Sequence, residues 1–312
     1  MQIIDTATTR RHLGFAPLID ALRRMFESGC EVPLRHTHRI GEAGTLLLMP
    51  AWRDGRRLGI KTVTIFPGNS TRQLPGLHST YLLFDAATGV PLAQLDGNEI
   101  TSRRTAAASA LAASFLARPD ARSLLIVGTG RVAALLAEAM RAVRPIDAVT
   151  VWNHRPASAQ ALAAQLTGAG IDARVSGDLA SAVASADIIS CATLATAPLI
   201  RGEWLRPGTH LDLIGSFTPQ MREVDAVCFA RSRVFVDTLE ALAKSGDVLE
   251  AVQAGAFSEA QLQGTLAELC QGARPGRSDA AERTLFKSVG TALEDLAAAE
   301  LVFDAVRGDA TV

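Results

Sequence analysis

The sequence predicts an α/β protein in which a doubly wound parallel sheet is accompanied by a second domain of antiparallel or mixed strands. Two observations lead to this fold class. From Ser123 onward, short apolar strand segments alternate with helical segments, which is typical of a parallel sheet covered on both faces. Before residue 120, strand segments follow one another across hairpin-like turns. With 312 residues, the chain is long enough to form two domains with separate cores.

The first 120 residues are expected to begin with an amphipathic helix over 15–26, because apolar residues recur there at helical spacing. Apolar runs then predict strands over 45–49, 59–66, 80–85 and 91–96. Turn signals separate them at Pro67-Gly68-Asn69, Thr88-Gly89 and Asp96-Gly97. An alanine-rich helix is expected over 106–117, and Pro119 would stop it.

The remaining chain alternates strands with helices. An apolar strand over 124–127 is followed by a glycine turn and a helix over 132–143. Further helices are expected over 157–166 and 179–184, and further strands over 148–152, 173–175, 188–192, 211–214 and 234–236. The C-terminal stretch 284–306 is expected to form one long helix, because apolar residues recur there at helical spacing.

Composition and charge indicate an ordinary globular protein. Hydrophobic residues make up 48% and charged residues 20%, and 31 basic against 32 acidic residues give a net charge of −1. This balance argues against a nucleic-acid or membrane surface. No apolar run reaches the roughly 18 residues of a membrane span, and residues 1–14 lack the apolar core of a signal peptide. We therefore expect a cytoplasmic protein with neither nucleic acid nor membrane as a partner.

Cysteine and histidine spacing predicts no metal site. His36 and His38 would lie on one face of a strand, but no further ligand accompanies them. The cysteines form no CxxC pair and are expected to be reduced thiols. They are Cys30, Cys191, Cys228 and Cys270.

The segment Gly128-Thr129-Gly130-Arg131-Val132-Ala133 has the pattern GxGxxA. Alone the pattern is weak, but here it follows a predicted strand and opens a predicted helix, so it indicates a dinucleotide site. Gly128 permits the tight turn, and Gly130 lets backbone N–H groups approach a pyrophosphate at the positive end of the helix. Val132 and Ala133 begin that helix. The alternative is a bare turn in a domain that binds no nucleotide.

The end of the next predicted strand bears on cofactor choice. An NAD site usually has Asp or Glu there to accept from the ribose hydroxyls. This chain has Asn153, His154 and Arg155, which suit a 2′-phosphate better. NADP(H) is therefore the expected cofactor, with NAD(H) as the alternative. The competing interpretation is that Arg155 is only a solvated loop charge.

Four stretches together carry a family resemblance. They are Gly59-Ile60-Lys61-Thr62-Val63, Asp96-Gly97-Asn98 with Arg103-Arg104-Thr105-Ala106-Ala107, the GxGxxA turn, and Phe286-Lys287-Ser288-Val289-Gly290. In this order, over nearly the whole chain, the sequence resembles the ornithine cyclodeaminase and mu-crystallin family. The resemblance implies a Rossmann-type NAD(P)-binding domain over 119–283. It also implies an α+β catalytic domain, formed by residues 1–118 and 284–312, whose sheets join two copies into a homodimer.

The resemblance also implies roles for individual residues. Arg35, Lys61 and Arg104 correspond to the cations that hold a substrate carboxylate, which needs paired positive charge when it leaves water. The simpler interpretations are that Arg35 is a surface charge, that Lys61 is a residue at a strand edge, and that Arg104 pairs with nearby acids at the start of a helix. Arg104 and Thr80 also match cofactor contacts, and Asn153, His154 and Arg155 occupy the adenosine-ribose position. The residues that correspond to the nicotinamide lining are Thr193, Leu213, Ile214 and Ser288.

One position departs from ornithine cyclodeaminases, which carry an Asp for proton handling shortly after an Ile-Gly strand end. Here Phe217 occupies that position, and a phenyl ring cannot transfer a proton. The surrounding segment, from Gly215 to Glu223, instead resembles bacterial reductases of Δ1-pyrroline-2-carboxylate and Δ1-piperideine-2-carboxylate. The alternative is that another carboxylate, Glu223 or Asp225, moves in and acts as the base in place of the missing Asp.

The expected function is NAD(P)H-dependent reduction of a small cyclic α-imino acid to proline or pipecolate. Ornithine cyclodeamination, or an amino-acid dehydrogenase of the same fold, is the first alternative. A mu-crystallin-like protein that binds nucleotide and a small ligand without useful turnover is the second. NADPH consumption separates enzyme from binder, and ammonia release from ornithine separates reductase from cyclodeaminase.

Overall fold

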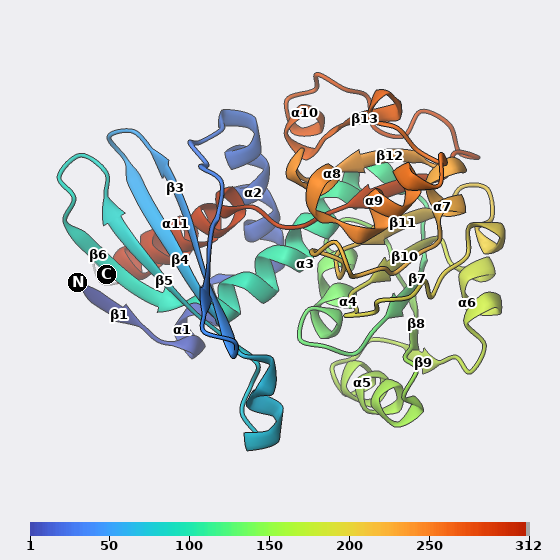
Figure 1. Ribbon diagram of the computed structural model, residues 1–312, viewed down its shortest axis with the longest axis horizontal. Helices are drawn as coiled ribbons and strands as arrows, with labels where there is room; N and C mark the ends of the chain where they lie inside the picture. Colours follow the sequence, from blue (N-terminus) through green and yellow to red (C-terminus); the bar gives the residue numbers. More distant parts are fainter. Residues whose placement is uncertain (310–312) are drawn as a thin grey trace. The chain divides into compact units, whose positions relative to one another are not determined.

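The computed structural model describes residues 1–309 and divides the chain into two compact units (Figure 1). Unit 2 is the continuous segment Thr105–Gly290. Unit 1 comprises Met1–Arg104 together with the chain from Thr291 onward. Unit 2 is therefore inserted into unit 1, but the boundaries differ from those expected at 118/119 and 283/284. They differ because helix α3 (Gly97–Leu116) continues through the first boundary without a linker, and because strand β14 (Thr284–Lys287) pairs within unit 2.

Unit 1 consists of a six-stranded sheet with helices. Its strands are β1 (Gln2–Ile4), β2 (His36–Ile40), β3 (Gly44–Arg53), β4 (Arg57–Ile65), β5 (Leu77–Asp85) and β6 (Pro91–Asp96). Its helices are α1 (Thr6–His12), α2 (Phe15–Ser28), the first part of α3, and α11 (Ala292–Asp309), with a 3-10 turn at Pro67–Arg72. The strand order is β1-β6-β5-β4-β3-β2. All pairs are antiparallel except β1 with β6, so the sheet is mixed.

The core of unit 1 lies between the sheet and its helices. Helix α2 buries an apolar stripe at helical spacing, and Gly29, with a φ of 73°, ends it. Helix α11 packs against α2, β3 and β4. Alternate strand residues such as Met49, Val63 and Leu83 are buried, as the two-residue period of a strand requires. The carboxylate of Asp96 accepts from the backbone N–H groups of Asn98 and Glu99, so α3 begins directly after β6 rather than at residue 106.

Unit 2 is an eight-stranded parallel sheet with helices between its strands, which confirms the predicted fold class. Its strands are β7 (Ser123–Val127), β8 (Ala148–Trp152), β9 (Ala173–Val175), β10 (Ile188–Cys191), β11 (His210–Leu213), β12 (Arg233–Val236), β13 (Leu262–Thr265) and β14. The helices are α4 (Ala133–Arg141), α5 (Pro156–Gly168), α6 (Leu179–Ser185), α7 (Ala226–Ala230), α8 (Glu240–Lys244), α9 (Gly246–Gln253) and α10 (Leu266–Cys270), with 3-10 turns at Gly202–Trp204 and Glu259–Gln261.

The strand order of unit 2 is β13-β12-β14-β11-β10-β7-β8-β9. The order reverses between β7 and β10, which are paired neighbours although β8 and β9 intervene in the sequence. Such a switch point is where an open parallel sheet binds its ligand, outside the carboxyl ends of the strands. The two central strands, β7 and β10, are buried apart from Ser123, which is why apolar residues dominate them.

The predicted helix over 284–306 is wrong over 284–291. Residues Thr284–Lys287 form strand β14, which inserts between β11 and β12 with parallel pairing on both sides. Gly290 then takes a φ of 75°, and α11 begins at Ala292. The apolar spacing fits a helix, but backbone hydrogen bonding to two neighbouring strands decides the conformation. Within residues 1–309, none of the helices combines the length and apolar character needed to cross a bilayer.

Candidate active site

A cluster of buried charges lies in unit 1, where β4, α3 and α11 meet. The ammonium of Lys61 on β4 is 2.7 Å from Asp295 Oδ2. The guanidinium of Arg104 on α3 donates from Nε to Asp295 Oδ1 at 2.9 Å and from Nη1 to Glu294 Oε2 at 2.6 Å. All four side chains are buried. The structure therefore brings together two of the three predicted carboxylate-binding cations, and adds two acids that sequence reasoning missed.

The charge states of this cluster follow from burial and mutual attraction. Burial lowers the pKa of Lys61 to about 8, although the Asp295 carboxylate opposes the shift. Burial would raise the pKa of Asp295, but the cations of Lys61 and Arg104 hold that pKa below its usual value. Both cations thus stay charged near neutral pH. Arg104 engages the two acids through Nε and Nη1, which leaves Nη2 for another acceptor, and the Lys61 ammonium has further donors.

The other residues predicted in unit 1 lie elsewhere on the sheet. Arg35 is half-buried and directly precedes the edge strand β2, whereas Lys61 is on β4, beyond β3. Thr80 is exposed on β5, opposite Thr62 and next in line to Tyr81, whose side chain points to the other face. His36 and His38 stack with ring centroids 6.5 Å apart. No group of metal-ligating side chains occurs in the described part of the chain.

The glycine turn of unit 2 follows β7 at the switch point. Gly128 has a φ of 114°, and a Cβ there would lie 2.5 Å from the Ala192 carbonyl oxygen, so only glycine fits. At Gly130 a Cβ would meet nothing within 4 Å, so the backbone there is open to a ligand. Val132 precedes α4, and Ala133 at its start is fully buried. This cradle at a helix N-terminus fits the pyrophosphate of a dinucleotide.

The end of β8 carries the three residues predicted at the adenosine ribose. The Asn153 amide donates to Thr129 Oγ1 at 2.7 Å, and its oxygen accepts from the Arg155 backbone N–H at 2.9 Å. Asn153 thereby ties the end of β8 to the glycine turn. His154 and Arg155 are exposed, and Arg155 precedes the first turn of α5. No acidic side chain follows β8 at this position.

The predicted nicotinamide-lining residues lie at the carboxyl ends of β10, β11 and β14. Thr193 follows β10, Leu213 and Ile214 end β11, and the Ser288 backbone N–H donates to the Leu213 carbonyl at 3.0 Å. The Ser288 hydroxyl donates to Asp237 at 2.9 Å. Asp237, at the end of β12, also accepts from the N–H groups of Val289 and Gly290. Sequence reasoning missed this role of Asp237; an acidic residue directly after an apolar strand was the available signal.

Phe217 is 38% exposed on the loop after β11, and the acids near it in sequence are engaged elsewhere. Glu223 is fully buried and accepts from Thr193, Gly215 and Ser216. Asp225 caps α7 by accepting from Cys228, and it also accepts from Gly202. Neither carboxylate is free to swing in as a base, which argues against the alternative considered from the sequence.

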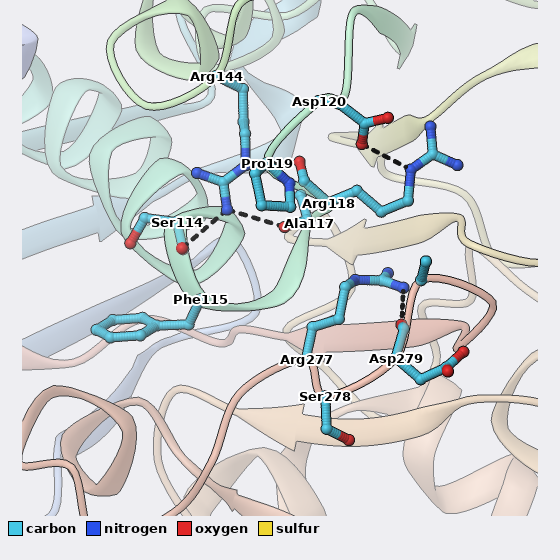
Figure 2. Close-up of a pocket in the computed structure, with 11 residues that line it drawn as sticks. Ser114, Phe115, Ala117, Arg118, Pro119, Asp120, Arg144, Arg277, Ser278 and Asp279 are labelled. Carbon is cyan, nitrogen blue, oxygen red and sulfur yellow. Dashed lines mark hydrogen bonds and ion pairs between the residues drawn. The ribbon is translucent and has the colours of Figure 1, made fainter.

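A hollow of about 290 Å³ in unit 2 lies at the amino end of β7, the edge away from the glycine turn (Figure 2). Two of its arginines, Arg144 and Arg277, donate to backbone carbonyls, and a third, Arg118, pairs with Asp120 and Asp187. Arg144 donates to the carbonyls of Ser114, Ala117 and Arg118 at the end of α3, and to that of Val143 beside it in sequence. Arg277 donates to five further carbonyls and a threonine hydroxyl. With their donors used in this way, these guanidinium groups hold the fold together and do not form an anion site.

Comparisons with known proteins show which family and which structures this chain resembles. The sequence profile of the ornithine cyclodeaminase/mu-crystallin family matches residues 4–310. The chain is 43% identical to a Δ1-pyrroline-2-carboxylate reductase of Paracoccus denitrificans, over 98% of each chain. It also superposes on the Thermococcus litoralis Δ1-pyrroline-2-carboxylate reductase in complex with NADH and L-proline. The TM-score is 0.94 and the identity 32%, over 99% of this chain and 98% of that one. An archaeal alanine dehydrogenase dimer with bound NAD superposes with a TM-score of 0.93 and 28% identity, over 99% of this chain and 97% of that one.

Proposed function

The chain belongs to the ornithine cyclodeaminase/mu-crystallin family, and we propose that it reduces a cyclic α-imino acid with NAD(P)H. It is an NAD(P)-dependent oxidoreductase. The substrate is Δ1-pyrroline-2-carboxylate or Δ1-piperideine-2-carboxylate, and the product is proline or pipecolate. The observation that carries the proposal is Phe217, which places apolar surface where a cyclodeaminase needs a base, while Glu223 and Asp225 are held elsewhere.

The chemistry of imine reduction suits these residues. The reduced nicotinamide supplies a hydride to the C=N carbon. A cyclic imine is readily protonated, and the resulting iminium is already a good electrophile, so no carboxylate base is required in this direction. Lys61 and Arg104 hold the substrate carboxylate through the donors that Glu294 and Asp295 leave free. A third cation at Arg35 and a cofactor contact at Thr80 stay predictions, since Thr80 lies on the sheet face opposite to Lys61.

For the cofactor, we propose NADP(H) as the preferred form of the nicotinamide nucleotide. The exposed Arg155 at the start of α5 and the absence of an acid after β8 support binding of a 2′-phosphate. The glycine cradle and Thr193, Leu213, Ile214 and Ser288 would hold the rest of the molecule. Two structural relatives were solved with NADH or NAD bound. The affinities of this protein for NADPH and NADH should therefore both be measured.

We propose a homodimer joined through the unit 1 sheet. Buried residues on β3, β4 and β5 alternate with half-exposed apolar ones, Leu48, Ile60, Leu82 and Phe84 among them, on the face away from α11. An apolar sheet face of this kind favours an interface. A structural relative is an alanine dehydrogenase dimer, which supports a second copy of this chain as the occupant.

The direct test compares two reactions of the purified protein. We expect oxidation of NADPH with Δ1-pyrroline-2-carboxylate or its six-membered homologue, followed at the nicotinamide absorbance band. We also expect that incubation with ornithine and NAD+ yields ammonia and proline more slowly by orders of magnitude. Proline formation from ornithine at a comparable rate would establish cyclodeamination instead. Binding of NADPH and imine without turnover would make the protein a small-ligand binder.

A further inference from the structure

Glu223 is a fully buried carboxylate in unit 2 whose two oxygens serve two different loops. Oε1 accepts from the backbone N–H and the hydroxyl of Thr193, at 2.8 and 2.9 Å. Oε2 accepts from the backbone N–H groups of Gly215 and Ser216, at 2.8 and 3.2 Å. Thr193 belongs to the loop after β10, and Gly215 and Ser216 belong to the loop after β11. One side chain therefore ties together the loops that leave two adjacent parallel strands.

These loops lie beside the glycine turn. Strand β10 pairs with β7 on one side and with β11 on the other. The Gly128 backbone is packed so closely on the loop after β10 that an added Cβ would lie 2.5 Å from the Ala192 carbonyl oxygen and 3.3 Å from Thr193 Cγ2. Any displacement of the Thr193 loop would therefore change the switch point, where the cofactor of an open parallel sheet binds.

Glu223 shares one buried cation, Lys287, with a second buried carboxylate, Asp247. The Lys287 ammonium at the end of β14 is 3.9 Å from Glu223 Oε2 and 3.3 Å from Asp247 Oδ2. Asp247 Oδ1 in turn accepts from the backbone N–H groups of Glu223 and Val224. Lys287 and Asp247 are fully buried too. Burial raises the pKa of Glu223 to about 7, against the opposing effect of the Lys287 charge. The hydrogen bonds of the Glu223 carboxyl group to both loops, and of Asp247 to the Glu223 backbone, fix these side chains in one arrangement.

We propose that Glu223 is a positioning residue for hydride transfer. It does not touch the nicotinamide; it fixes the loops of Thr193 and Gly215–Ser216 against which the nicotinamide lies. This inference rests on the proposed function, because it assigns those loops to the cofactor's reactive end. It is distinct from the base role considered for Glu223, since the carboxylate is buried and all its hydrogen bonds go to loop groups.

The substitution Glu223→Gln isolates this role. Glutamine keeps the volume but has one acceptor oxygen, so it serves only one loop, and its amide would face the N–H donors of the other. Misplacement of reacting groups by about 1 Å can lower a rate on the order of 100-fold. We therefore expect kcat for imine reduction to fall at least about tenfold. The dissociation constant of 2′-phospho-ADP-ribose, or of ADP-ribose if NADH is preferred, should stay within about twofold, because these fragments lack the nicotinamide.

Asp225→Asn is the matched control, since Asp225 is two residues away and also accepts backbone N–H groups, but at α7 and Gly202. It should leave kcat unchanged. Glu223→Asp keeps the charge opposite Lys287 but is too short to reach both loops, so it should lower kcat even if the Gln variant fails to fold. Wild-type kcat in either Glu223 variant, equal loss of fragment binding, or the same loss in Asp225→Asn would overturn the inference. A wild-type chain that binds neither NADPH nor NADH would overturn the proposed function itself.

Discussion

Lys61 and Arg104 share two buried carboxylates at the start of α11, so unit 1 neutralises both cations before any ligand binds. A substitution of Lys61 or Arg104 is therefore expected to change the stability of the fold as well as substrate binding. The cations cannot be removed as independent surface charges, because Asp295 and Glu294 would remain buried without partners. Their geometry does support a substrate role, since Arg104 retains a free edge of its guanidinium fork.

The first prediction concerns Arg104. Arg104→Ala should lower the free energy of unfolding by about 3–5 kcal/mol, the usual loss when one partner of a buried pair is removed. Arg104→Lys should fold but lower kcat/KM at least about tenfold, because a lysine cannot engage both acids and a substrate carboxylate. Urea unfolding and steady-state kinetics measure the two effects. Arg103→Ala is the control, since Arg103 pairs with Glu99 and the Leu13 carbonyl and lies over the Phe15 ring, away from the two acids, and it should change stability by about 1 kcal/mol. Wild-type kinetics in Arg104→Lys would remove Arg104 from the substrate site.

The second prediction concerns Arg155. Its side chain is exposed and forms no ion pair within residues 1–309, so it is available to a ligand phosphate. Arg155→Ala should weaken NADPH binding by about 1–3 kcal/mol, the usual value of a charged hydrogen bond, and leave NADH binding unchanged. Titration of nucleotide fluorescence with both cofactors measures this difference. Equal affinity of the wild-type protein for NADPH and NADH would contradict the assignment.

At the scale of elements, polar side chains are buried inside the parallel sheet and on the helix α3 next to it. Asp212 on β11 is fully buried, and the hydroxyls of Ser190 on β10 and Ser109 on α3 lie close enough to influence its carboxyl group. Burial raises the pKa of Asp212 to about 7, against a smaller opposing effect of these hydroxyls and of Lys287. A strand predicted simply as apolar thus carries a proton-binding group at its centre.

The third prediction follows from that raised pKa. Between its ordinary pKa of 3.8 and about 7, the folded protein binds a proton at Asp212 that the unfolded chain releases. This contribution to stability is therefore fully present below about pH 4 and is lost as pH rises through 7. Asp212→Asn removes the titration, so relative to wild type it should gain on the order of 1–3 kcal/mol between pH 5 and pH 8. Urea unfolding at both pH values measures this gain. The same difference between the two proteins at both values would contradict it.

At the scale of the whole molecule, the sheets of the two units present different features to ligands and partners. The unit 2 sheet is all parallel and places the glycine turn and the loops of Thr193 and Gly215 at one edge. The unit 1 sheet has a helix-covered face with the Lys61 cluster and a second face of half-exposed apolar residues. That second face is the basis for the proposed homodimer.

The fourth prediction tests the dimer. Leu82→Glu places a charge on the apolar face of β5, and an unpaired charge in an interface is strongly unfavourable. It should raise the dimer dissociation constant at least about 100-fold, near 3 kcal/mol. Size-exclusion chromatography with light scattering measures the mass of each variant. Val175→Glu, on strand β9 of unit 2, makes the same change away from this face and should stay dimeric. A monomeric wild type, or a dimeric Leu82→Glu, would place the interface elsewhere.

The sequence by itself determined the alternation of apolar strands and helices, the glycine turn and the family. These signals are local: strand β6 spans the predicted residues, and Gly128 is required by its own backbone conformation. It also determined that Phe217 stands where ornithine cyclodeaminases carry an Asp, because the identity of a residue is read directly from the sequence. Such features depend on neighbours within a few positions, so they are recorded in the order of the residues.

Only the tertiary structure decided which distant residues meet. The pairing of β14 with β11 and β12 overrode a helical pattern, because hydrogen bonds to two strands outweigh local spacing. The partners of Arg104 lie 190 and 191 residues away in α11, and Lys61 pairs with one of them, Asp295. Glu223 joins loops that leave two different strands. A buried charge must find a partner wherever the fold supplies one, and its position in the sequence does not say where that is.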